Sequence, residues 1–338
     1  MSKILVTGGL GFIGSTAIKM ILSKTHDEVL NIDKHSYASM PEALDLVESI
    51  SRYSFLKIDI GQYELTKKVI ADYVPDVILH LAAESHVDNS INSPKEFIES
   101  NIIGTYNLLQ AANELWTDED RLNKKFIHVS TDEVYGSLEQ NEAPFTESTK
   151  YSPNSPYSAS KASSDMLARA WYKTFGIPVI ITNCSNNYGP WQFPEKLIPV
   201  VIKKALNHEK IPIYGDGLNI RDWLFVEDHA AALINIYQNG EAGEKYNIGG
   251  NNEISNLDLV EKICAILDEV SPSMNIPKYS QLISFVRDRP GHDLRYAIDA
   301  TKIAKELNFI PSIEIDAGLM KTVQWYVKNK DWLNQKSS

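Results

Sequence analysis

The sequence predicts an α/β protein built on a doubly wound parallel sheet, joined to a smaller mixed α/β domain. The first observation is that short apolar runs alternate with longer amphipathic segments through the first half of the chain. This alternation is typical of parallel strands connected by helices that cover both faces of a sheet. The second observation is a change after about residue 183, where proline and glycine cluster and the apolar runs become short and scattered. The third is the length of 338 residues, which at ~150 residues per domain favours about two domains.

Each expected element rests on its residue pattern. Buried strands are predicted at the short apolar runs 4–6, 29–32, 55–58, 77–81, 126–129 and 179–181. Helices are predicted at the longer amphipathic segments 12–22, 65–73, 97–116, 156–175, 197–206, 227–238, 256–270 and 315–327. We expect residues 1–185 to form the sheet domain, with returning segments near 223–240 and 296–300. Residues 186–222 and 241–338 are expected to form the second domain.

Composition excludes several classes of function. The chain has 33 Lys and Arg against 44 Asp and Glu, a net charge of −11, so it lacks the basic surface that nucleic-acid binding requires. Its two cysteines, Cys184 and Cys264, fit neither a metal-ligand spacing nor a disulfide framework. No apolar run approaches the ~20 residues of a membrane span. We therefore expect a soluble cytoplasmic protein that binds no metal, nucleic acid or membrane.

A glycine-rich turn follows the first predicted strand and opens the first predicted helix. Gly8, Gly11 and Gly14 lie in the string TGGLGFIG, and Asp33 ends the second strand 19 residues after Gly14. Glycine lets the backbone approach a pyrophosphate, and the helix N-terminus offers N–H donors and a partial positive charge. An acidic residue at this distance accepts hydrogen bonds from the ribose hydroxyls of NAD. The pattern therefore predicts an NAD site.

Reactive side chains are predicted at the same edge of the sheet. The fifth strand runs into Ser130, Thr131, Asp132 and Glu133, and a helix entered through a proline carries Tyr157 and Lys161. The spacing i, i+4 places Tyr157 and Lys161 on one face of that helix. A tyrosine has a pKa near ~10, and a neighbouring ammonium and an oxidised nicotinamide would lower it toward the working range of a base.

These strings resemble those of the extended short-chain dehydrogenase/reductases that act on nucleotide sugars, and among them most closely the dTDP-glucose 4,6-dehydratases. The resemblance rests on residues 7–14, 80–88, 130–136, 155–165, 183–190, 193–199, 220–223 and 287–293, and so spans nearly the whole chain. It implies NAD as a tightly held cofactor and a nucleoside-diphosphate glucose, such as dTDP-glucose, as the substrate. The implied reaction oxidises carbon 4 of the hexose, eliminates water across carbons 5 and 6, and reduces carbon 6.

The resemblance also implies a role for each reactive residue. Tyr157, supported by Lys161, would take the proton of the hydroxyl at carbon 4, and Thr131 would hold that oxygen. Glu133 would remove the proton at carbon 5. Asp132, kept protonated, would donate to the leaving hydroxyl at carbon 6. Two adjacent carboxyls in a closed site need not titrate alike, so one can act as the acid and the other as the base.

The binding residues implied by the resemblance fall into two sets. The NAD set is Gly8, Gly11, Phe12, Ile13, Gly14, Asp33, Lys34, Asp59, Ile60, Leu81, Ala82, Ala83, Ser85, Ser100, Ser130, Tyr157, Lys161 and Asn187. The sugar-nucleotide set is Ser85, Thr131, Asn186, Glu195, Lys196, Leu197, Pro212, Tyr214, Arg221, Asn256, Arg289 and His292. The cations of the second set would offset the negative net charge locally at the diphosphate.

Some positions depart from the family pattern and leave alternatives open. Residues 34–40 differ from the usual loop, Trp191 replaces a usual Tyr, and Asn89 stands where the dTDP-glucose enzymes usually carry Arg and UDP-glucose 4,6-dehydratases carry Asn. The nucleotide base is therefore open between thymine and uracil. A nucleotide-sugar 4-epimerase, a UDP-glucuronate decarboxylase and a dinucleotide-sensing scaffold protein are less favoured readings. The two long helices 97–116 and 156–175 carry apolar faces at helical spacing, and the resemblance implies that they form a four-helix bundle with those of a second subunit in a homodimer.

Overall fold

Seven parallel strands form the central sheet of the computed structural model, which describes residues 1–288 and 292–336. The strand order is β10-β6-β5-β4-β1-β2-β3, so the chain reverses direction across the sheet between β1 and β4. In open α/β sheets, ligands bind where the order reverses, outside the carboxyl ends of the strands. The strands are β1 (Lys3–Thr7), β2 (Glu28–Asp33), β3 (Tyr53–Lys57), β4 (Val77–His80), β5 (Lys125–Thr131), β6 (Val179–Cys184) and β10 (Lys245–Ile248). The predicted doubly wound parallel sheet is therefore confirmed.

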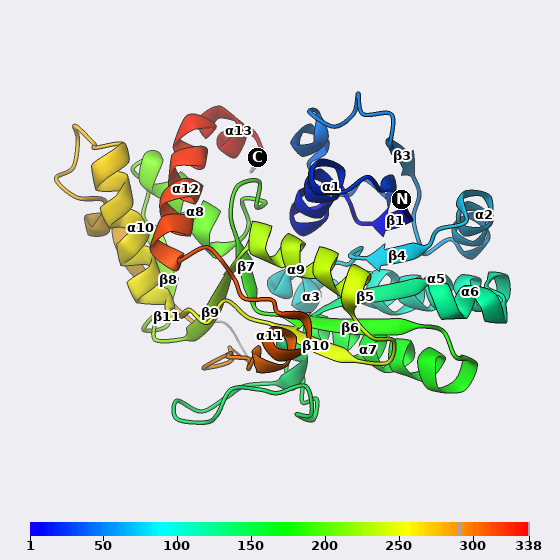
Figure 1. Ribbon diagram of the computed structural model, residues 1–338. Coiled ribbons are helices and arrows are strands. Elements are labelled where there is room, and N and C mark those ends of the chain that lie inside the picture. The colour runs from blue at the N-terminus through cyan, green and yellow to red at the C-terminus, as the bar shows by residue number, and fades with distance from the viewer. Residues whose placement is uncertain (289–291, 337–338) are drawn as a thin grey trace.

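Helices cover both faces of this sheet (Figure 1). On one face α1 (Phe12–Lys24) packs against α9 (Val226–Asn239), and on the other α5 (Gly104–Leu115) packs against α2 (Tyr63–Tyr73) and α7 (Pro156–Phe175). Strands β1, β2, β4, β5 and β6 are almost wholly buried, as expected for parallel strands between two helical layers. The helix predicted over 97–116 has three parts: the end of α4 (Pro94–Phe97), a π-helical segment (Ile98–Ile103) and α5.

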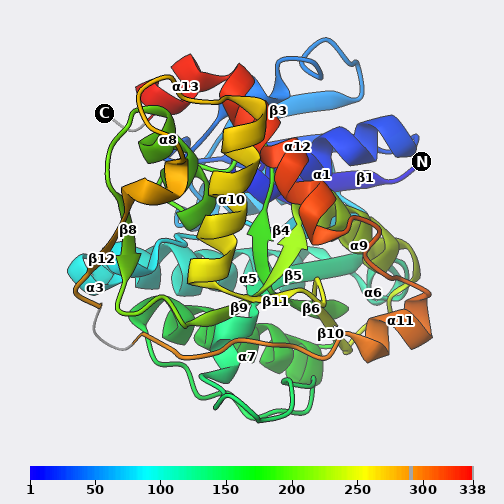
Figure 2. The ribbon, with the colours of Figure 1, turned by 90° about the vertical axis from the view of Figure 1, so that its left-hand side faces the viewer.

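A second hydrophobic core lies beside the sheet, toward the viewer in Figure 2. It is built from α8 (Leu197–Leu206), α10 (Asn256–Val270) and α12 (Ile315–Lys328) with two small sheets. Strand β9 (Ile220–Phe225) lies between β7 (Asn186–Tyr188) and β11 (Glu253–Ser255), and β8 (Ile211–Tyr214) pairs with β12 (Ile283–Val286). The remaining helices are α3 (Val87–Asn92), α6 (Asp118–Asn123), α11 (Thr301–Leu307) and α13 (Lys330–Gln335). The smaller mixed α/β part was thus predicted correctly in kind.

The chain passes between the two parts more than once. Helix α9 returns to the large sheet, within the segment predicted to return near 223–240. Strand β10 then pairs with β6 as the edge strand of that sheet, so the return extends to residue 248, beyond the predicted limit. Three residues of β10 are buried, and two of them, Tyr246 and Ile248, belong to the large hydrophobic core. Their burial stabilises this short strand at the edge of the sheet.

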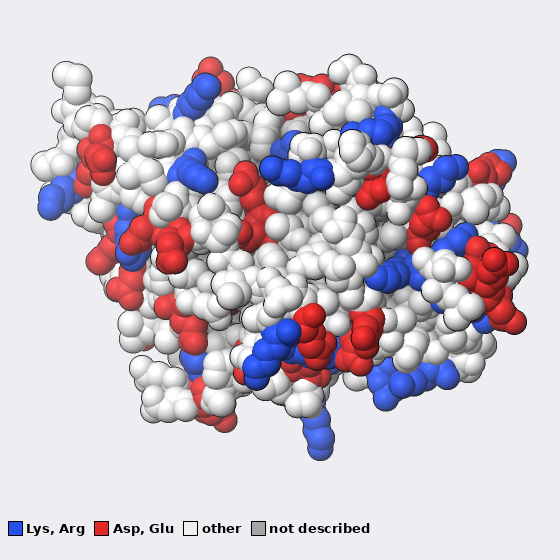
Figure 3. All heavy atoms as spheres, in the orientation of Figure 1, with Lys and Arg blue, Asp and Glu red and all other residues white. Residues whose placement is uncertain are grey.

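Surface charge is mixed on the face shown in Figure 3, where acidic and basic side chains are interspersed. Within residues 1–288 and 292–336, no helix is long and apolar enough to cross a bilayer. The same part of the chain contains no cluster of His, Cys, Asp and Glu that could hold a metal ion.

Candidate active site

The glycine turn between β1 and α1 is shaped by contacts that exclude side chains. Gly8 has a φ of +72°, and a Cβ at this position would lie 2.6 Å from the amide nitrogen of Ala82. A Cβ at Gly14 would lie 2.3 Å from the carbonyl oxygen of Gly8. Gly11 is the N-cap residue of α1 and supplies no side-chain cap. The first N–H groups of α1 are therefore available to an anion at this turn, as pyrophosphate binding requires.

Asp33 is held in a fixed orientation at the end of β2. Its Oδ2 accepts the Leu10 N–H at 3.1 Å, and its Oδ1 accepts from the backbone N–H of His35 at 2.8 Å and from Ser39 Oγ at 3.2 Å. A carboxylate has about four acceptor positions, so these contacts leave capacity for a ribose hydroxyl. The residues present at the turn and at Asp33 fit the adenosine diphosphate half of NAD.

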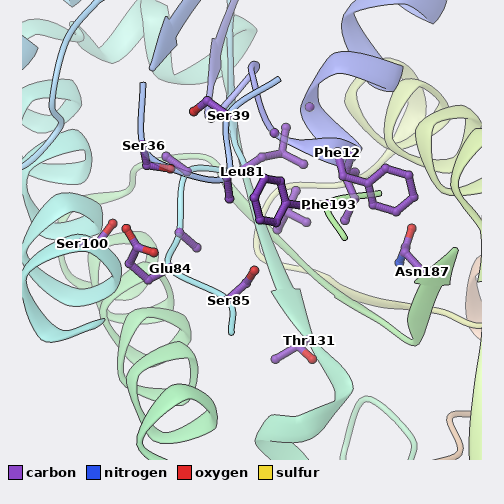
Figure 4. Close-up of a pocket in the computed structure, with 18 of the residues that line it drawn as sticks. Phe12, Ser36, Ser39, Leu81, Glu84, Ser85, Ser100, Thr131, Asn187 and Phe193 are labelled. Atoms are coloured by element: carbon purple, nitrogen blue, oxygen red, sulfur yellow. The ribbon is translucent and has the colours of Figure 1, made fainter. Parts of the chain in front are cut away.

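One cavity collects the residues at the carboxyl edge of the sheet (Figure 4). Every residue of the predicted NAD set lines it, as do all five predicted catalytic residues. No binding or catalytic role was predicted for the other lining residues, which are Ile32, Ser36, Ala38, Ser39, Met40, Ile58, Glu84, Val129, Cys184, Ser185, Gln192 and Phe193. Several of them directly adjoin predicted residues, but the 36–40 loop carries no motif that would have marked it.

The reactive hydroxyls and carboxyls come from the end of β5 and the start of α7. Thr131 is the last residue of β5, and its Oγ1 donates to Asp132 Oδ1 at 3.3 Å and accepts the Glu133 N–H at 3.3 Å. A 3₁₀ turn over Asp132–Tyr135 follows directly, so both carboxyls stay at the edge of the sheet. The two side chains are therefore presented to the cavity by a fixed turn rather than by a mobile loop.

Helix α7 begins in a way that fixes the Tyr157–Lys161 pair. Ser155 caps it in a capping box with Ser158, and a proline occupies the first turn. Lys161 is buried, and its Nζ donates to the carbonyl oxygen of Val129 at 2.9 Å. Tyr157 is nearly buried, at 9% exposure. The pair thus lies inside the protein beside β5, facing the same cavity as Asp132 and Glu133.

The two adjacent carboxyls lie in different environments. Asp132 is 1% exposed. Burial raises its pKa well above the ordinary value, and the charges of Glu133 and Asp222 raise it further. Both effects favour the protonated form of Asp132, which is the form that a general acid requires.

Charges around the Tyr157–Lys161 pair act in opposite directions. Burial, and then the charge of Glu133, raises the pKa of Tyr157 well above its ordinary value, whereas a hydrogen bond with Thr131 lowers it. Burial lowers the pKa of Lys161, and the charge of Asp165 opposes that shift. The protein groups alone therefore keep the Tyr157 hydroxyl protonated, so the expected lowering of its pKa has to come from the bound cofactor.

Asp165 lies one helical turn after Lys161 and is a residue that the sequence analysis did not assign a role. His128 Nε2 lies 3.1 Å from its Oδ1, and its Oδ2 accepts from the Tyr151 hydroxyl at 2.8 Å and from Asn183 Nδ2 at 3.2 Å. Burial acts to raise the pKa of Asp165, but the hydrogen bond and charge of His128 hold it below the ordinary value. A buried anion is thus maintained behind Lys161.

The predicted sugar-nucleotide set divides between the cavity and the second part of the protein. Five of its members line the cavity: Ser85, Thr131, Asn186, Glu195 and Lys196. Leu197, Pro212, Tyr214, Arg221, Asn256 and His292 lie outside its lining, and Arg289 lies outside the described residues. Lys196 Nζ donates to the carbonyl oxygen of Ser85 at 2.8 Å, which joins the two sides of the cavity.

Arg221 differs most from its predicted role. It is 4% exposed, and its guanidinium donates to the carbonyl oxygens of Ile220 at 2.7 Å and Asp293 at 2.9 Å. The same group lies over the ring of Tyr296, 4.3 Å from its centroid. These contacts hold the segment around residue 293 against β9, so contact of Arg221 with a diphosphate remains a prediction.

The Rossmann sheet, the glycine turn and the Tyr157–Lys161 pair together define a nicotinamide-dependent enzyme of the short-chain dehydrogenase/reductase class. Residues 5–322 match the family model described as GDP-mannose 4,6 dehydratase. The chain is 54% identical to a dTDP-glucose 4,6-dehydratase of Neisseria meningitidis, over 98% of this chain and 95% of the relative. It is 52% identical to one of Escherichia coli, over 98% of this chain and 95% of the relative. The chain belongs to this nucleotide-sugar dehydratase family and, within it, to the dTDP-glucose 4,6-dehydratases.

Solved structures agree with this placement. A Streptomyces venezuelae dTDP-glucose 4,6-dehydratase with NAD bound superimposes with a TM-score of 0.90 at 40% identity, covering 99% of each chain. One from Bacillus anthracis in complex with NAD gives 0.87 at 43% identity, covering 99% of this chain and 100% of the other. A UDP-glucose 4-epimerase of Thermotoga maritima gives 0.84 at 27% identity, covering 97% and 99%. Epimerases thus share this fold. The fold alone therefore does not distinguish dehydration from epimerisation, and the residues of the site have to do so.

Proposed function

We propose that this protein catalyses the NAD-dependent dehydration of dTDP-glucose to dTDP-4-keto-6-deoxyglucose and water. The observation that carries the proposal is the Asp132–Glu133 pair at the cavity, with Asp132 buried and its pKa raised well above the ordinary value. A 4-epimerase has no use for an acid and a base beyond the Tyr157–Lys161 pair. A dehydratase needs both, because a proton leaves carbon 5 while a hydroxyl leaves carbon 6.

The first step places Tyr157 as the base at the hydroxyl of carbon 4. Thr131 holds the same oxygen by hydrogen bonding, and its hydroxyl already acts to lower the pKa of Tyr157. The glycine turn and Asp33 would hold NAD, which would supply the acceptor for the hydride of carbon 4 and the donor of that hydride to carbon 6. Its positive ring charge beside Tyr157 would favour the phenolate, against the burial and the Glu133 charge that oppose it.

The elimination places the two carboxyls in different roles. The new ketone at carbon 4 acidifies the proton on carbon 5, which Glu133 removes as the base. Asp132, the buried member of the pair, donates its proton to the hydroxyl that leaves carbon 6 as water. General acid and base groups of this kind typically contribute about 10²–10⁴-fold each to the rate.

The direct test is incubation of the purified protein with dTDP-glucose and, separately, with UDP-glucose. The proposal predicts a product with the alkaline absorbance of a 4-keto-6-deoxy sugar, formed faster from dTDP-glucose. Faster turnover of UDP-glucose would select the UDP-glucose 4,6-dehydratase alternative, to which Asn89 points. An NAD-loaded protein that converts neither sugar would contradict dehydration, and a 4-epimer as the product would select the epimerase.

The sugar-nucleotide contacts belong to the same proposal. Ser85, Asn186, Glu195 and Lys196 line the cavity, and in this proposal they contact the sugar and its neighbouring phosphate. The members of the set outside the cavity lining belong to the second part of the protein, on which the nucleotide base would rest. Lys196→Ala tests the assignment, because loss of a phosphate partner should raise the KM for dTDP-glucose more than it lowers kcat.

We also propose that the protein forms a homodimer through α5, α7 and the π-helical segment. This face carries exposed apolar side chains, which include Ile103 at 44%, Tyr106 at 39% and Met166 at 54% exposure. Helices α5 and α7 already pack side by side, so a second copy would complete a four-helix bundle. Sedimentation should show a dimer that Met166→Glu dissociates, whereas a monomer in the unaltered protein would contradict this arrangement.

A further inference from the structure

Tyr37 lies at the rim of the NAD cavity and is used by neither the predicted binding set nor the chemistry. Its neighbours in the loop, Ser36 and Ala38, line the cavity, whereas Tyr37 itself does not. Tyr37 is 55% exposed, yet its hydroxyl has two hydrogen-bond partners. It donates to Glu195 Oε2 at 3.0 Å and accepts from Asn89 Nδ2 at 3.0 Å.

The ring of Tyr37 makes a third contact with the same region. It meets Phe193 edge to face, with ring centroids 5.6 Å apart and an interplanar angle of 86°, a favourable aromatic arrangement. Phe193 lines the cavity, and in the view of Figure 4 it lies between Phe12 on one side and Ser36 on the other. Tyr37 is therefore in contact with a side chain that lines the cavity.

Three separate segments meet at Tyr37. The 34–40 loop follows β2, Asn89 belongs to α3, and Glu195 precedes α8 in the second part of the protein. A separate contact outside the cavity joins the turn that follows this loop to the C-terminal helix, where Trp332 Nε1 of α13 donates to Glu42 Oε1 at 2.7 Å. The Tyr37 contacts thus join the loop after β2, on the cofactor side of the cavity, to Glu195, which lines the cavity from the second part of the protein.

We propose that Tyr37 is a positioning residue that latches the cavity and retains NAD between turnovers. Retention suits the chemistry, because NAD is reduced and reoxidised within one cycle and has no need to leave. The inference rests on the proposed function only in taking NAD as the resident cofactor. Burial and the charge of Glu195 raise the pKa of Tyr37, so its hydroxyl remains a donor throughout the neutral range.

The test measures release of NAD from the holoenzyme in the absence of any sugar nucleotide. Labelled NAD is loaded, unlabelled NAD is added in excess, and loss of label is followed for the unaltered protein and for Tyr37→Phe. Losing one hydrogen bond to a carboxylate and one to an amide should speed release by roughly 10-fold. Because no turnover is involved, the outcome is independent of whether dTDP-glucose is dehydrated.

Tyr53→Phe is the matched control. The Tyr53 hydroxyl also accepts from an asparagine amide, Asn31 Nδ2, at 3.1 Å, but Tyr53 does not line the cavity. Its removal should leave NAD release unchanged. Unchanged release from Tyr37→Phe, or equally accelerated release from both variants, would overturn the proposal.

A second measurement separates a latch from a general loss of structure. Asn89→Ala should speed NAD release in the unaltered background but add little in Tyr37→Phe, because both changes open the same contact. Excess NAD should restore most of the turnover lost in Tyr37→Phe. Fully additive effects of the two changes, or turnover that excess NAD fails to restore, would contradict a latching role.

Discussion

A methyl group at Gly14 tests the glycine turn most sharply. The Cβ of alanine would lie 2.3 Å from the Gly8 carbonyl oxygen and 2.8 Å from the Cα atom of Gly9, where ordinary contact begins at 3.4 Å. The turn or α1 would have to move by about 1 Å, and overpacking of this kind costs about 1–3 kcal/mol. The higher helix propensity of alanine offsets at most ~1 kcal/mol of this cost. Gly14→Ala should therefore both lower the free energy of unfolding and weaken NAD binding.

Gly11→Ala provides the contrast. Its Cβ would lie 3.2 Å from the Gly8 oxygen, and Gly11 has an ordinary extended conformation with a φ of −78°. The methyl group would enter the space where the pyrophosphate approaches, so NAD affinity should fall while the free energy of unfolding changes by less than about 1 kcal/mol. Both variants are unfolded in denaturant after NAD has been removed, because bound NAD would itself stabilise the folded state. Equal stability of Gly14→Ala and the unaltered protein would refute the close approach.

Three further changes test the chemistry. Glu133→Gln should retain NAD yet lower both exchange of the carbon 5 proton with solvent and turnover by about 10²–10⁴-fold; exchange at the normal rate, followed by NMR in D₂O, would remove Glu133 from its role. Asp132 has a raised pKa in the folded state, so its contribution to stability is present at low pH and is lost as pH rises from the unfolded value near ~3.9 toward the folded one. Asp132→Asn should therefore raise the free energy of unfolding, relative to that of the unaltered protein, more at pH 7 than at pH 3.5, and it should slow the elimination. Denaturant unfolding of both proteins at the two pH values measures this effect, and an equal difference between the proteins at both pH values would contradict it. Asp33→Ala should weaken NAD binding and reduce the preference for NAD over NADP, and an unchanged ratio of the two affinities in titrations would show that Asp33 does not select the cofactor.

The sheet and the cofactor side were predictable because their signals are local. The glycine turn, Asp33 and the Tyr157–Lys161 pair each lie at fixed spacing within one strand–helix unit, so the fold brings them to one edge. The helix predicted over 97–116 contains a π-helical segment, and Gly104, which follows that segment, packs so closely against Ile60 that a Cβ would lie 2.6 Å from Ile60 Cδ1. No residue spacing in the sequence predicts such a close approach between a helix and a distant side chain.

The substrate side was less predictable because its residues meet through tertiary contacts. The sequence predicts that Arg221 contacts the diphosphate, but in the folded protein its guanidinium donates to main-chain carbonyl oxygens. Tyr37, Asn89 and Glu195 are far apart in the chain, and only the folded structure brings them into hydrogen-bond contact. Trp191 adopts a φ of +70°, and its ring packs tilted against Trp325 and edge to face against Trp332 of the C-terminal helices, a packing that no local pattern predicts.

In the proposed reaction, oxidation at carbon 4 and reduction at carbon 6 occur within one cycle on one bound NAD. The most direct measurement uses dTDP-glucose that carries deuterium on carbon 4, with the product examined by NMR and mass spectrometry. We expect a 6-deoxy product with that deuterium on carbon 6 and a hydrogen from solvent on carbon 5. Deuterium returned to carbon 4, or lost to solvent, would contradict it.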